Sequence, residues 1–273
     1  MKNRESFRDA FHVKHGEAVR LAKIDPADTC SITRKADARA ALKENITRLA
    51  DLQYQLYAEN KRSLLIVLQA MDAGGKDGTI RHVTSGLNPQ GCRVTSFKAP
   101  SDEELDHDFL WRIHRAAPRR GEIGIFNRSH YEDVVTVRVL RLVPKGIWRP
   151  RYGHINAFEK MLAQEGTTIL KFFLLVSKDE QRKRLQKRFE NPRKMWKANP
   201  ADLKARELWD EYMTAYEDAL SRCSTRWAPW FVIPADVKWF RDLAVSQIMV
   251  KALEDMELRL PTPAFEPGSV EIT

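Results

Sequence analysis

The chain carries an apolar run at residues 64–68, Leu-Leu-Ile-Val-Leu, that leads into a glycine-containing loop ending in Gly75 and Lys76. A strand, such a loop and then a helix is the order that a phosphate-binding loop requires. Backbone N–H groups at the helix start point at the anion, and the helix dipole favours negative charge there. The stretch therefore predicts an α/β fold with a phosphate site after this strand, rather than a plain glycine turn with a surface lysine.

The loop departs from the usual phosphate-loop pattern in two places. Ala70 replaces the first glycine, and Asp77 stands where a serine or threonine hydroxyl would hold Mg²⁺. The loop also carries a carboxylate, Asp72, which phosphate would repel unless a divalent cation lay between them. We therefore predict that Asp72 works with a metal ion. The predicted phosphate-binding positions of the loop are Ala73, Gly74, Gly75, Lys76, Asp77 and Gly78.

Strand and helix patterns alternate along the chain. Strands are expected at residues 64–68, 92–97, 122–126, 167–176 and 230–233. Helices are expected at residues 38–59, 76–86, 101–117, from 131, at 152–164, 178–190, 200–222 and 238–258. This alternation predicts a doubly wound parallel sheet of five strands with helices on both faces. Ligands bind such sheets beyond the carboxyl ends of the strands.

The chain shows no repeat and no convincing linker, so it is expected to form one domain over residues 36–260. An N-terminal arm, residues 1–35, and a flexible tail, residues 261–273, are expected to flank it. Residues 178–222 are expected to form a helical lid, with Asn199-Pro200 opening its second helix.

The first lid segment is strongly basic, with nine basic against three acidic residues at 178–197. On a helix, Gln181, Arg184, Lys187 and Arg188 share one face, while Leu185 and Phe189 point inward. Such a helix can close cations over a phosphate chain. A solvated basic face is the alternative.

A second polar cluster follows the expected strand at 122–126. Asn127 stands at the strand end, where a metal-positioning carboxylate is usual, and the acids Glu132 and Asp133 come later. Arg128 can brace a transferring phosphoryl group. His130 is expected to be structural, because no second histidine lies at ligand spacing.

Composition limits the partners and the compartment. The net charge of +9 is compatible with a polyanion such as nucleic acid, an anionic membrane or a phosphate polymer. Three well-separated cysteines argue against a disulfide framework or a zinc site, and no secretory signal or long apolar run is visible. We expect a cytoplasmic protein that uses neither membrane nor nucleic acid, since no nucleic-acid-binding motif is present.

Three segments in this order resemble the family-2 polyphosphate kinases: residues 70–78, residues 127–133 and the basic stretch that ends at residues 191–197. The likeness extends from about residue 20 to residue 258. Family members that mainly use nucleoside diphosphates read Asp-Arg-Ser-Trp-Tyr-Asn-Arg in the second segment. This chain differs at Asn127, His130, Glu132 and Asp133 and so resembles the class III branch, whose members phosphorylate AMP and ADP.

The resemblance implies a phosphate-loop kinase fold with a lid, a homo-oligomer, and reversible transfer of the terminal phosphoryl group of inorganic polyphosphate to AMP and ADP, forming ADP and ATP. Mg²⁺ is the implied cofactor, and Mn²⁺ can substitute. Three sets of residues are implied: catalytic Asp72, Lys76, Arg128 and Glu132; polyphosphate-binding Arg184, Lys187 and Arg188; and nucleotide-binding Asn127, Arg128, Glu132 and Asp133. The implied metal ligands are Asp72 with Glu132 or Asp133, and Glu132 is the candidate selector between acceptors.

Two other functions remain open. An ATP-dependent nucleoside monophosphate kinase shares the loop but normally carries Ser or Thr where this chain has Asp77. A nucleic-acid-binding protein would use the basic surface instead.

Overall fold

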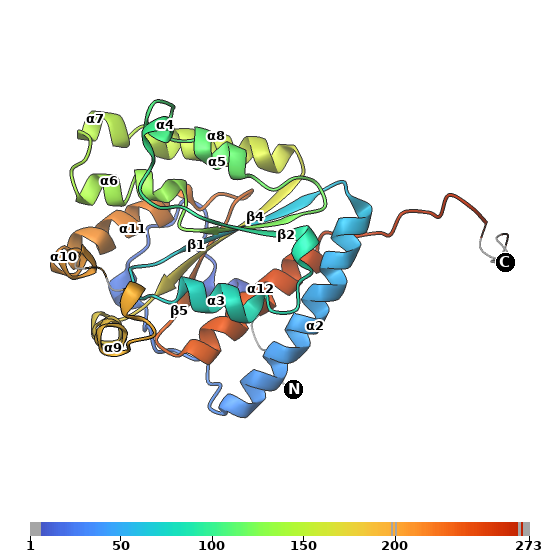
Figure 1. The fold of residues 1–273 in the computed structure, drawn as a ribbon, viewed down its shortest axis with the longest axis horizontal. Coiled ribbons are helices and arrows are strands. Elements are labelled where there is room, and N and C mark those ends of the chain that lie inside the picture. The colour runs from blue at the N-terminus through green and yellow to red at the C-terminus, as the bar shows by residue number, and fades with distance from the viewer. Residues whose placement is uncertain (1–6, 198, 200, 267–268, 270–273) are drawn as a thin grey trace.

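The computed structural model of this chain describes residues 7–197, 199, 201–266 and 269. Its centre is a five-stranded parallel sheet in the order β2-β3-β1-β4-β5, which confirms the predicted fold class (Figure 1). The strands are β1 (Ser63–Gln69), β2 (Cys92–Ser96), β3 (Ile123–Asn127), β4 (Thr167–Leu175) and β5 (Trp230–Pro234). All five therefore deliver their carboxyl ends to one edge of the sheet.

Helices cover both faces of the sheet because the central strand is apolar on both sides. Leu64, Ile66 and Leu68 of β1 pack under α2 (Lys35–Glu59), α3 (Lys76–Val83) and α12 (Lys238–Glu254). Leu65 and Val67, which point the other way, pack under α8 (Arg151–Gln164) and α11 (Trp209–Cys223). Continuous apolar runs of this kind are typical of parallel strands buried on both faces.

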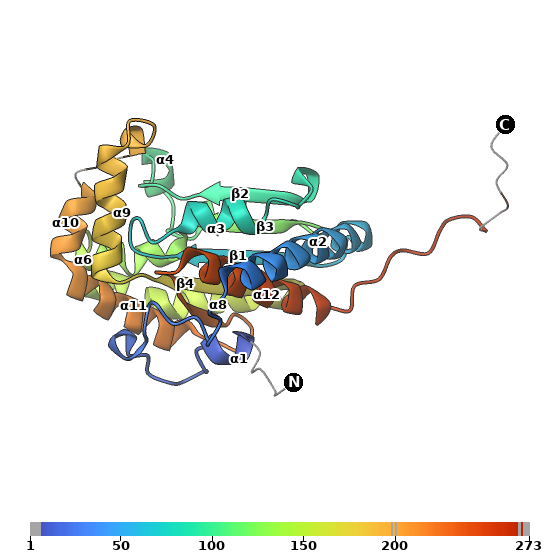
Figure 2. The same ribbon diagram turned by 90° about the horizontal axis from the view of Figure 1, so that it is seen from below.

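The lid segment lies beyond the carboxyl edge of the sheet, where α9 (Lys178–Glu190) and α10 (Ala201–Glu207) stand beside each other (Figure 2). A short 3₁₀ turn, Met195–Lys197, follows α9. The helix expected at residues 200–222 is two helices, because Leu208 (φ −94°, ψ 26°) leaves helical geometry between α10 and α11. The Pro200 start of that prediction lies outside the described residues.

The helix expected at residues 101–117 is also wrong as a single element. Ser101 forms the predicted capping box with Glu104, but α4 (Asp102–Leu105) ends after one turn, and α5 (Trp111–Ala116) starts separately. Between them the Asp108 carboxylate accepts the N–H of Leu110 at 2.9 Å. Such local side-chain bonds compete with helix continuation.

The region after β3 contains less helix than the sequence predicted. A 3₁₀ turn spans His130–Asp133, and two helices of four residues follow, α6 (Thr136–Val139) and α7 (Lys145–Trp148). The polar cluster therefore sits in a tight turn directly against the sheet edge.

The N-terminal segment packs on the far edge of the sheet. It contains α1 (Phe7–Phe11) and a 3₁₀ turn, Leu21–Lys23. Val13 donates its N–H to the carbonyl of Trp230 at 2.9 Å, and an isolated antiparallel bridge joins His12 to Phe231. These contacts cover β5, which would otherwise present an open edge.

After α12 the described chain leads away from the domain (Figures 1 and 2). None of the helices in the described part of the chain combines the length and the apolar character needed to cross a bilayer.

Candidate active site

The predicted phosphate loop connects β1 to α3, and its backbone is strained. Ala73 has φ +60° and Gly75 has φ +114°, both in the left-handed region. A Cβ added at Gly75 would lie 2.0 Å from Nη1 of Arg241, so only glycine fits there. Strained backbone of this kind persists where the surrounding structure holds it, and it is frequent at ligand-binding sites.

Lys76, the first residue of α3, is buried at the end of this loop. Its Nζ donates to the carbonyl oxygen of Ala70 at 2.9 Å. Burial lowers the pKa of Lys76, and the carboxylate of Asp72 opposes that shift. The ammonium is thus held inside the loop, close to the carboxylate of Asp72, which is predicted to act with it at the phosphates.

Asp72 and Arg128, 56 residues apart in sequence, form an ion pair of 2.5 Å. Burial opposes ionisation of Asp72, but the charges of Lys76 and Arg128 outweigh it and hold the pKa of Asp72 below its ordinary value. Arg128 has φ +63°, and its N–H bonds the carbonyl of Leu68 at 3.0 Å. The sheet order places β3 next to β1, which is why the two predicted motifs meet.

Glu132 lies beside this pair. Its Oε2 accepts from the hydroxyl of Thr136 at 2.6 Å, and with the Gln69 amide in its better-bonded orientation Oε1 accepts from Gln69 at 3.0 Å. Burial opposes the charge of Arg128, but Asp72 and Glu132 raise the pKa of Arg128 above its ordinary value. The four predicted catalytic residues are therefore grouped at one sheet edge.

The other two residues predicted to bind nucleotide, Asn127 and Asp133, bond different partners. The Asn127 amide donates to Asp77 Oδ1 at 2.9 Å and so contacts the phosphate loop. Asp133 pairs with Arg151 at 3.4 Å and Arg112 at 3.9 Å, and burial raises the pKa of Asp133 to about 6. A metal or nucleotide role for Asp133 stays a prediction, with its carboxylate held in an arginine cluster.

Arg184 of α9 binds the phosphate loop itself. Its Nη1 donates to the carbonyls of Ala73 (3.3 Å) and Gly74 (3.0 Å). Its Nη2 donates to those of Ala235 (2.6 Å) and Asp236 (3.0 Å), and its Nε donates to Glu180 (2.8 Å). A guanidinium has five N–H donors, so this set engages all of them.

The remaining residues of the predicted basic face differ in exposure. Lys187 is exposed and Arg188 is half-buried, with its charge close enough to Asp72 to help lower the pKa of that carboxyl. Gln181, predicted on the same face, is buried, and its amide donates to the carbonyl of Asp72 at 2.9 Å. The base of α9 is therefore bonded to the phosphate loop.

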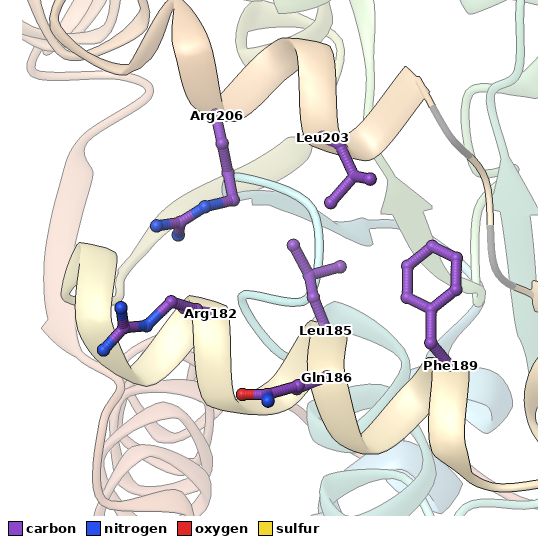
Figure 3. A pocket seen from close by; sticks show the side chains of 6 residues that line it. All are labelled: Arg182, Leu185, Gln186, Phe189, Leu203 and Arg206. Carbon is purple, nitrogen blue, oxygen red and sulfur yellow. The ribbon is translucent and has the colours of Figure 1, made fainter.

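A pocket of about 260 Å³ lies between the two lid helices (Figure 3). Arg206 of α10 lines it and also donates to Gln181 Oε1 at 2.7 Å. Leu185, Phe189 and Leu203 form its apolar wall. Through Arg206 and Gln181, the wall of the pocket is thus linked to the Asp72 carbonyl of the phosphate loop.

Sequence reasoning missed Arg241 and Asp242, at the start of α12. Arg241 is buried beside Gly75 and pairs with Asp242 at 2.6 Å. Asp242 also bonds His82 Nδ1 at 2.8 Å and so ties α12 to α3. Two adjacent charged residues within an apolar helix face were the available signal, but only the fold shows that they support the phosphate loop.

No group of three or more His, Cys, Asp or Glu side chains in the described part of the chain forms a ready-made metal site. Mg²⁺ is nevertheless commonly held by one or two carboxylates together with substrate phosphates. Asp72 fits that donor set, since neighbouring cations keep its pKa low and its side chain is partly exposed. Glu132 is the second carboxylate near the same cations.

Comparison with known proteins gives one consistent answer. The family model for Polyphosphate kinase 2 (PPK2) matches residues 32–261. The chain is 54% identical over 254 residues to the AMP/ADP-polyphosphate phosphotransferase of Meiothermus ruber, covering 93% of this chain and 95% of that protein. It is 47% identical to the ADP-polyphosphate phosphotransferase of Rhodopseudomonas palustris, covering 93% of each.

A solved structure supports the same assignment. The crystal structure of Polyphosphate Kinase 2 from Arthrobacter aurescens superposes with a TM-score of 0.92 at 44% identity, over 96% of this chain and 94% of that one. The matched region contains the phosphate loop, the second motif and the lid. The chain therefore belongs to the polyphosphate kinase 2 family.

Proposed function

We propose that this protein is a phosphotransferase that moves the terminal phosphoryl group of inorganic polyphosphate to AMP and to ADP. The observation that carries the proposal is the meeting of Asp72, Lys76, Arg128 and Glu132 at the carboxyl edge of the sheet. The relatives named above support the choice of donor and acceptors.

In this proposal, the phosphate loop binds the end of the polyphosphate chain that donates the phosphoryl group. Backbone N–H groups at the start of α3 and the ammonium of Lys76 face the terminal phosphates, and the helix dipole adds to their attraction. The terminal phosphoryl group gains negative charge on its oxygens during transfer, so cations fixed in advance lower the barrier. Lys76 and Arg128 are those cations in this proposal.

The acceptor is a nucleotide phosphate, whose oxygen is already ionised at neutral pH. No strong general base is needed, and positioning carries most of the rate. Arg128 pairs with Asp72 and lies close enough to Glu132 for that charge to act on it, so it can orient the acceptor phosphate against the donor. Glu132 is the proposed selector between AMP and ADP.

Mg²⁺, or Mn²⁺ in its place, would be held by Asp72, with Glu132 as the second candidate, and would supply charge neutralisation between carboxylate and phosphates. Arg128 pairs with the Asp72 carboxylate. Two proposed roles complete the site: Lys187 and Arg188 attract the polyphosphate chain, and Arg184 braces the loop.

The test offers purified protein AMP or ADP with either polyphosphate or ATP as donor, in Mg²⁺, and resolves the products by chromatography. We expect ADP and ATP to form from polyphosphate. ATP-driven phosphorylation of AMP with no turnover from polyphosphate would instead identify a nucleoside monophosphate kinase. Tight, steeply salt-dependent DNA binding without either activity would identify a nucleic-acid-binding protein.

Asp72→Asn and Lys76→Ala test the site assignment. Both side chains are proposed to act on transition-state charge, so each variant is expected to lose turnover while keeping its folded circular dichroism spectrum. Near-normal activity in either one would remove that residue from the catalytic group.

A further inference from the structure

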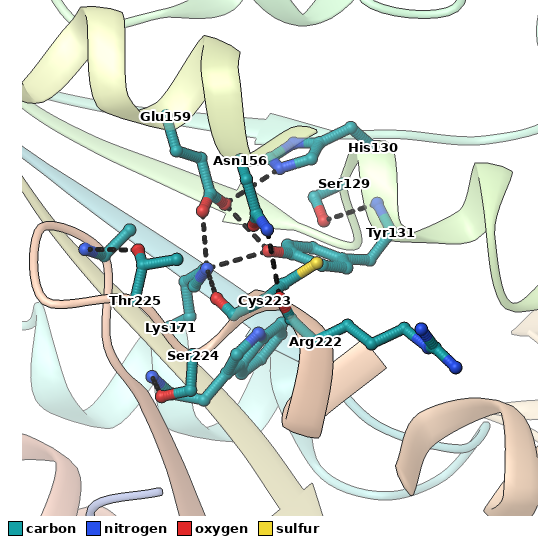
Figure 4. A network of polar contacts seen from close by, with 12 residues as sticks. Ser129, His130, Tyr131, Asn156, Glu159, Lys171, Arg222, Cys223, Ser224 and Thr225 are labelled. Carbon is teal, nitrogen blue, oxygen red and sulfur yellow. Dashed lines mark hydrogen bonds and ion pairs between the residues drawn. The ribbon is translucent and has the colours of Figure 1, made fainter. Parts of the chain in front are cut away.

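A network of polar contacts around Lys171 and Glu159 is buried in the core, and neither residue is a proposed substrate contact (Figure 4). Lys171 lies in the middle of β4 among apolar neighbours, on the face covered by α8 and α11, and pairs with Glu159 of α8 at 2.5 Å. The two side chains are 0% and 1% exposed. Removing two charges from water is costly, and apolar residues of similar size are often as stabilising.

Both members of this pair bond residues of the second motif, Tyr131 and His130. Lys171 Nζ donates to the hydroxyl of Tyr131 at 2.8 Å and to the carbonyl of Cys223 at 2.7 Å. Glu159 Oε1 accepts from the Tyr131 hydroxyl at 2.9 Å and lies 3.1 Å from His130 Nε2. Lysine has three donors, and all three are engaged.

His130 and Tyr131 lie between Arg128 and Glu132 in the sequence. Both side chains are buried, and the Tyr131 ring packs edge-on against Trp230, with centroids 4.7 Å apart. Residues 128–133, called here the 128–133 turn, carry the two proposed catalytic groups Arg128 and Glu132. This turn is therefore anchored in the core at two consecutive residues, His130 and Tyr131. Arg128 itself stays in a left-handed conformation, which needs such support.

We propose that the Lys171–Glu159 pair is a positioning device that holds the 128–133 turn in its active geometry through Tyr131 and His130. The pair touches no substrate and acts on the proposed catalytic groups through this turn. The same pair bonds the carbonyl of Cys223, so it also fixes the end of α11 relative to the turn. The proposal rests on the proposed function for its kinetic test but not for its structural one.

The first test uses Tyr131→Phe, which removes only the hydroxyl and keeps the ring in the core. We expect kcat to fall about tenfold or more, since small misplacements of reacting groups are costly, while KM for polyphosphate changes less than twofold. Amide hydrogen exchange in residues 128–135 should become faster. That readout needs no activity, so a failure of the proposed function leaves it interpretable.

The control is Thr167→Val, which breaks the buried hydroxyl bond from Ser63 (3.0 Å) at the opposite, amino edge of the same sheet. It should lower the melting temperature without changing kcat or the exchange of residues 128–135.

A second variant separates stability from positioning. Lys171→Met combined with Glu159→Met removes both charges together, so neither is left unpaired in the core. We expect a melting temperature near that of the wild type, with kcat still lowered and exchange of the turn still faster. Wild-type kcat and exchange in this double variant, or in Tyr131→Phe, would overturn the proposal and leave the pair a packing feature only.

Discussion

The substitution Arg184→Lys distinguishes two possible roles of Arg184 in α9: bracing the phosphate loop, and binding polyphosphate directly. In the structure, the guanidinium spans four backbone carbonyls, two of the phosphate loop and two that follow β5, and also bonds Glu180. An ammonium has three donors. With one donor kept by Glu180, lysine loses at least two of the four carbonyl bonds.

The expected magnitude follows from that loss. At about 1 to 1.5 kcal/mol for each bond, the free energy of unfolding falls by about 2 to 3 kcal/mol. For a chain of this size, that corresponds to a melting temperature lower by roughly 5 to 10 °C. Since the loop carbonyls of Ala73 and Gly74 lose their support, kcat should fall about tenfold or more.

The assay combines thermal melting with initial rates over a range of polyphosphate concentrations, and the matched control is Lys187→Ala. Lys187 is exposed on the same helix, so its loss should raise KM for polyphosphate and leave the melting temperature unchanged. A variant Arg184→Lys with a normal melting temperature, normal kcat and a raised KM would refute the bracing role. Arg184 would then act on polyphosphate directly.

Three other perturbations have outcomes that the structure specifies. Gly75→Ala places a Cβ 2.0 Å from Arg241 Nη1 at φ +114°, so kcat should fall about a hundredfold. The control Gly153→Ala, whose added Cβ has nothing within 4 Å, should leave rates unchanged. Equal kcat values in the two variants would contradict the argument. Burial raises the pKa of Asp133 from 3.8 to about 6, so the folded form holds its proton longer than the unfolded form and stability falls as pH rises through this range. Relative to the wild type, the free energy of unfolding of Asp133→Asn should therefore rise by roughly 2.4 kcal/mol between pH 4 and 7, since pH 4 already lies slightly above the unfolded pKa. Urea unfolding at both pH values that shows no relative gain would refute this. Glu132→Asn should reduce kcat/KM for AMP more than for ADP, and an unchanged ratio of the two values would exclude Glu132 as the selector.

Local sequence patterns predicted the elements well where a single interaction type dominates. The alternation of apolar runs and amphipathic helices gave the five strands and their helices, because strand and helix periods are read within a few residues. The breaks at residues 106–110 and at Leu208 were missed. At the first of these, the Asp108 carboxylate bonds the N–H of Leu110 and competes with the helix.

The sequence predicted individual residues of the candidate site, but it did not predict the contacts that hold them together. Asp72 and Lys76 were identified from the chemistry that a phosphate loop needs, and Arg128 from the polar cluster after the third strand. The structure pairs Asp72 with Arg128 and brings Lys76 close enough for its charge to act on both. The engagement of all five Arg184 donors could not be foreseen, because it depends on the chain after β5 returning beside the phosphate loop.

The amino-acid sequence by itself determined the phosphate loop, the parallel α/β architecture and the family, since each is encoded in short contiguous stretches. Only the tertiary structure decided which side chains support that loop and the 128–133 turn. Arg241 lies against Gly75 of the loop, and Lys171 and Glu159 bond Tyr131 of the turn. The physical reason is the strand order. Tyr131 and Lys171 are 40 residues apart in the chain, and Gly75 and Arg241 are 166 apart; no local pattern specifies which strands become neighbours.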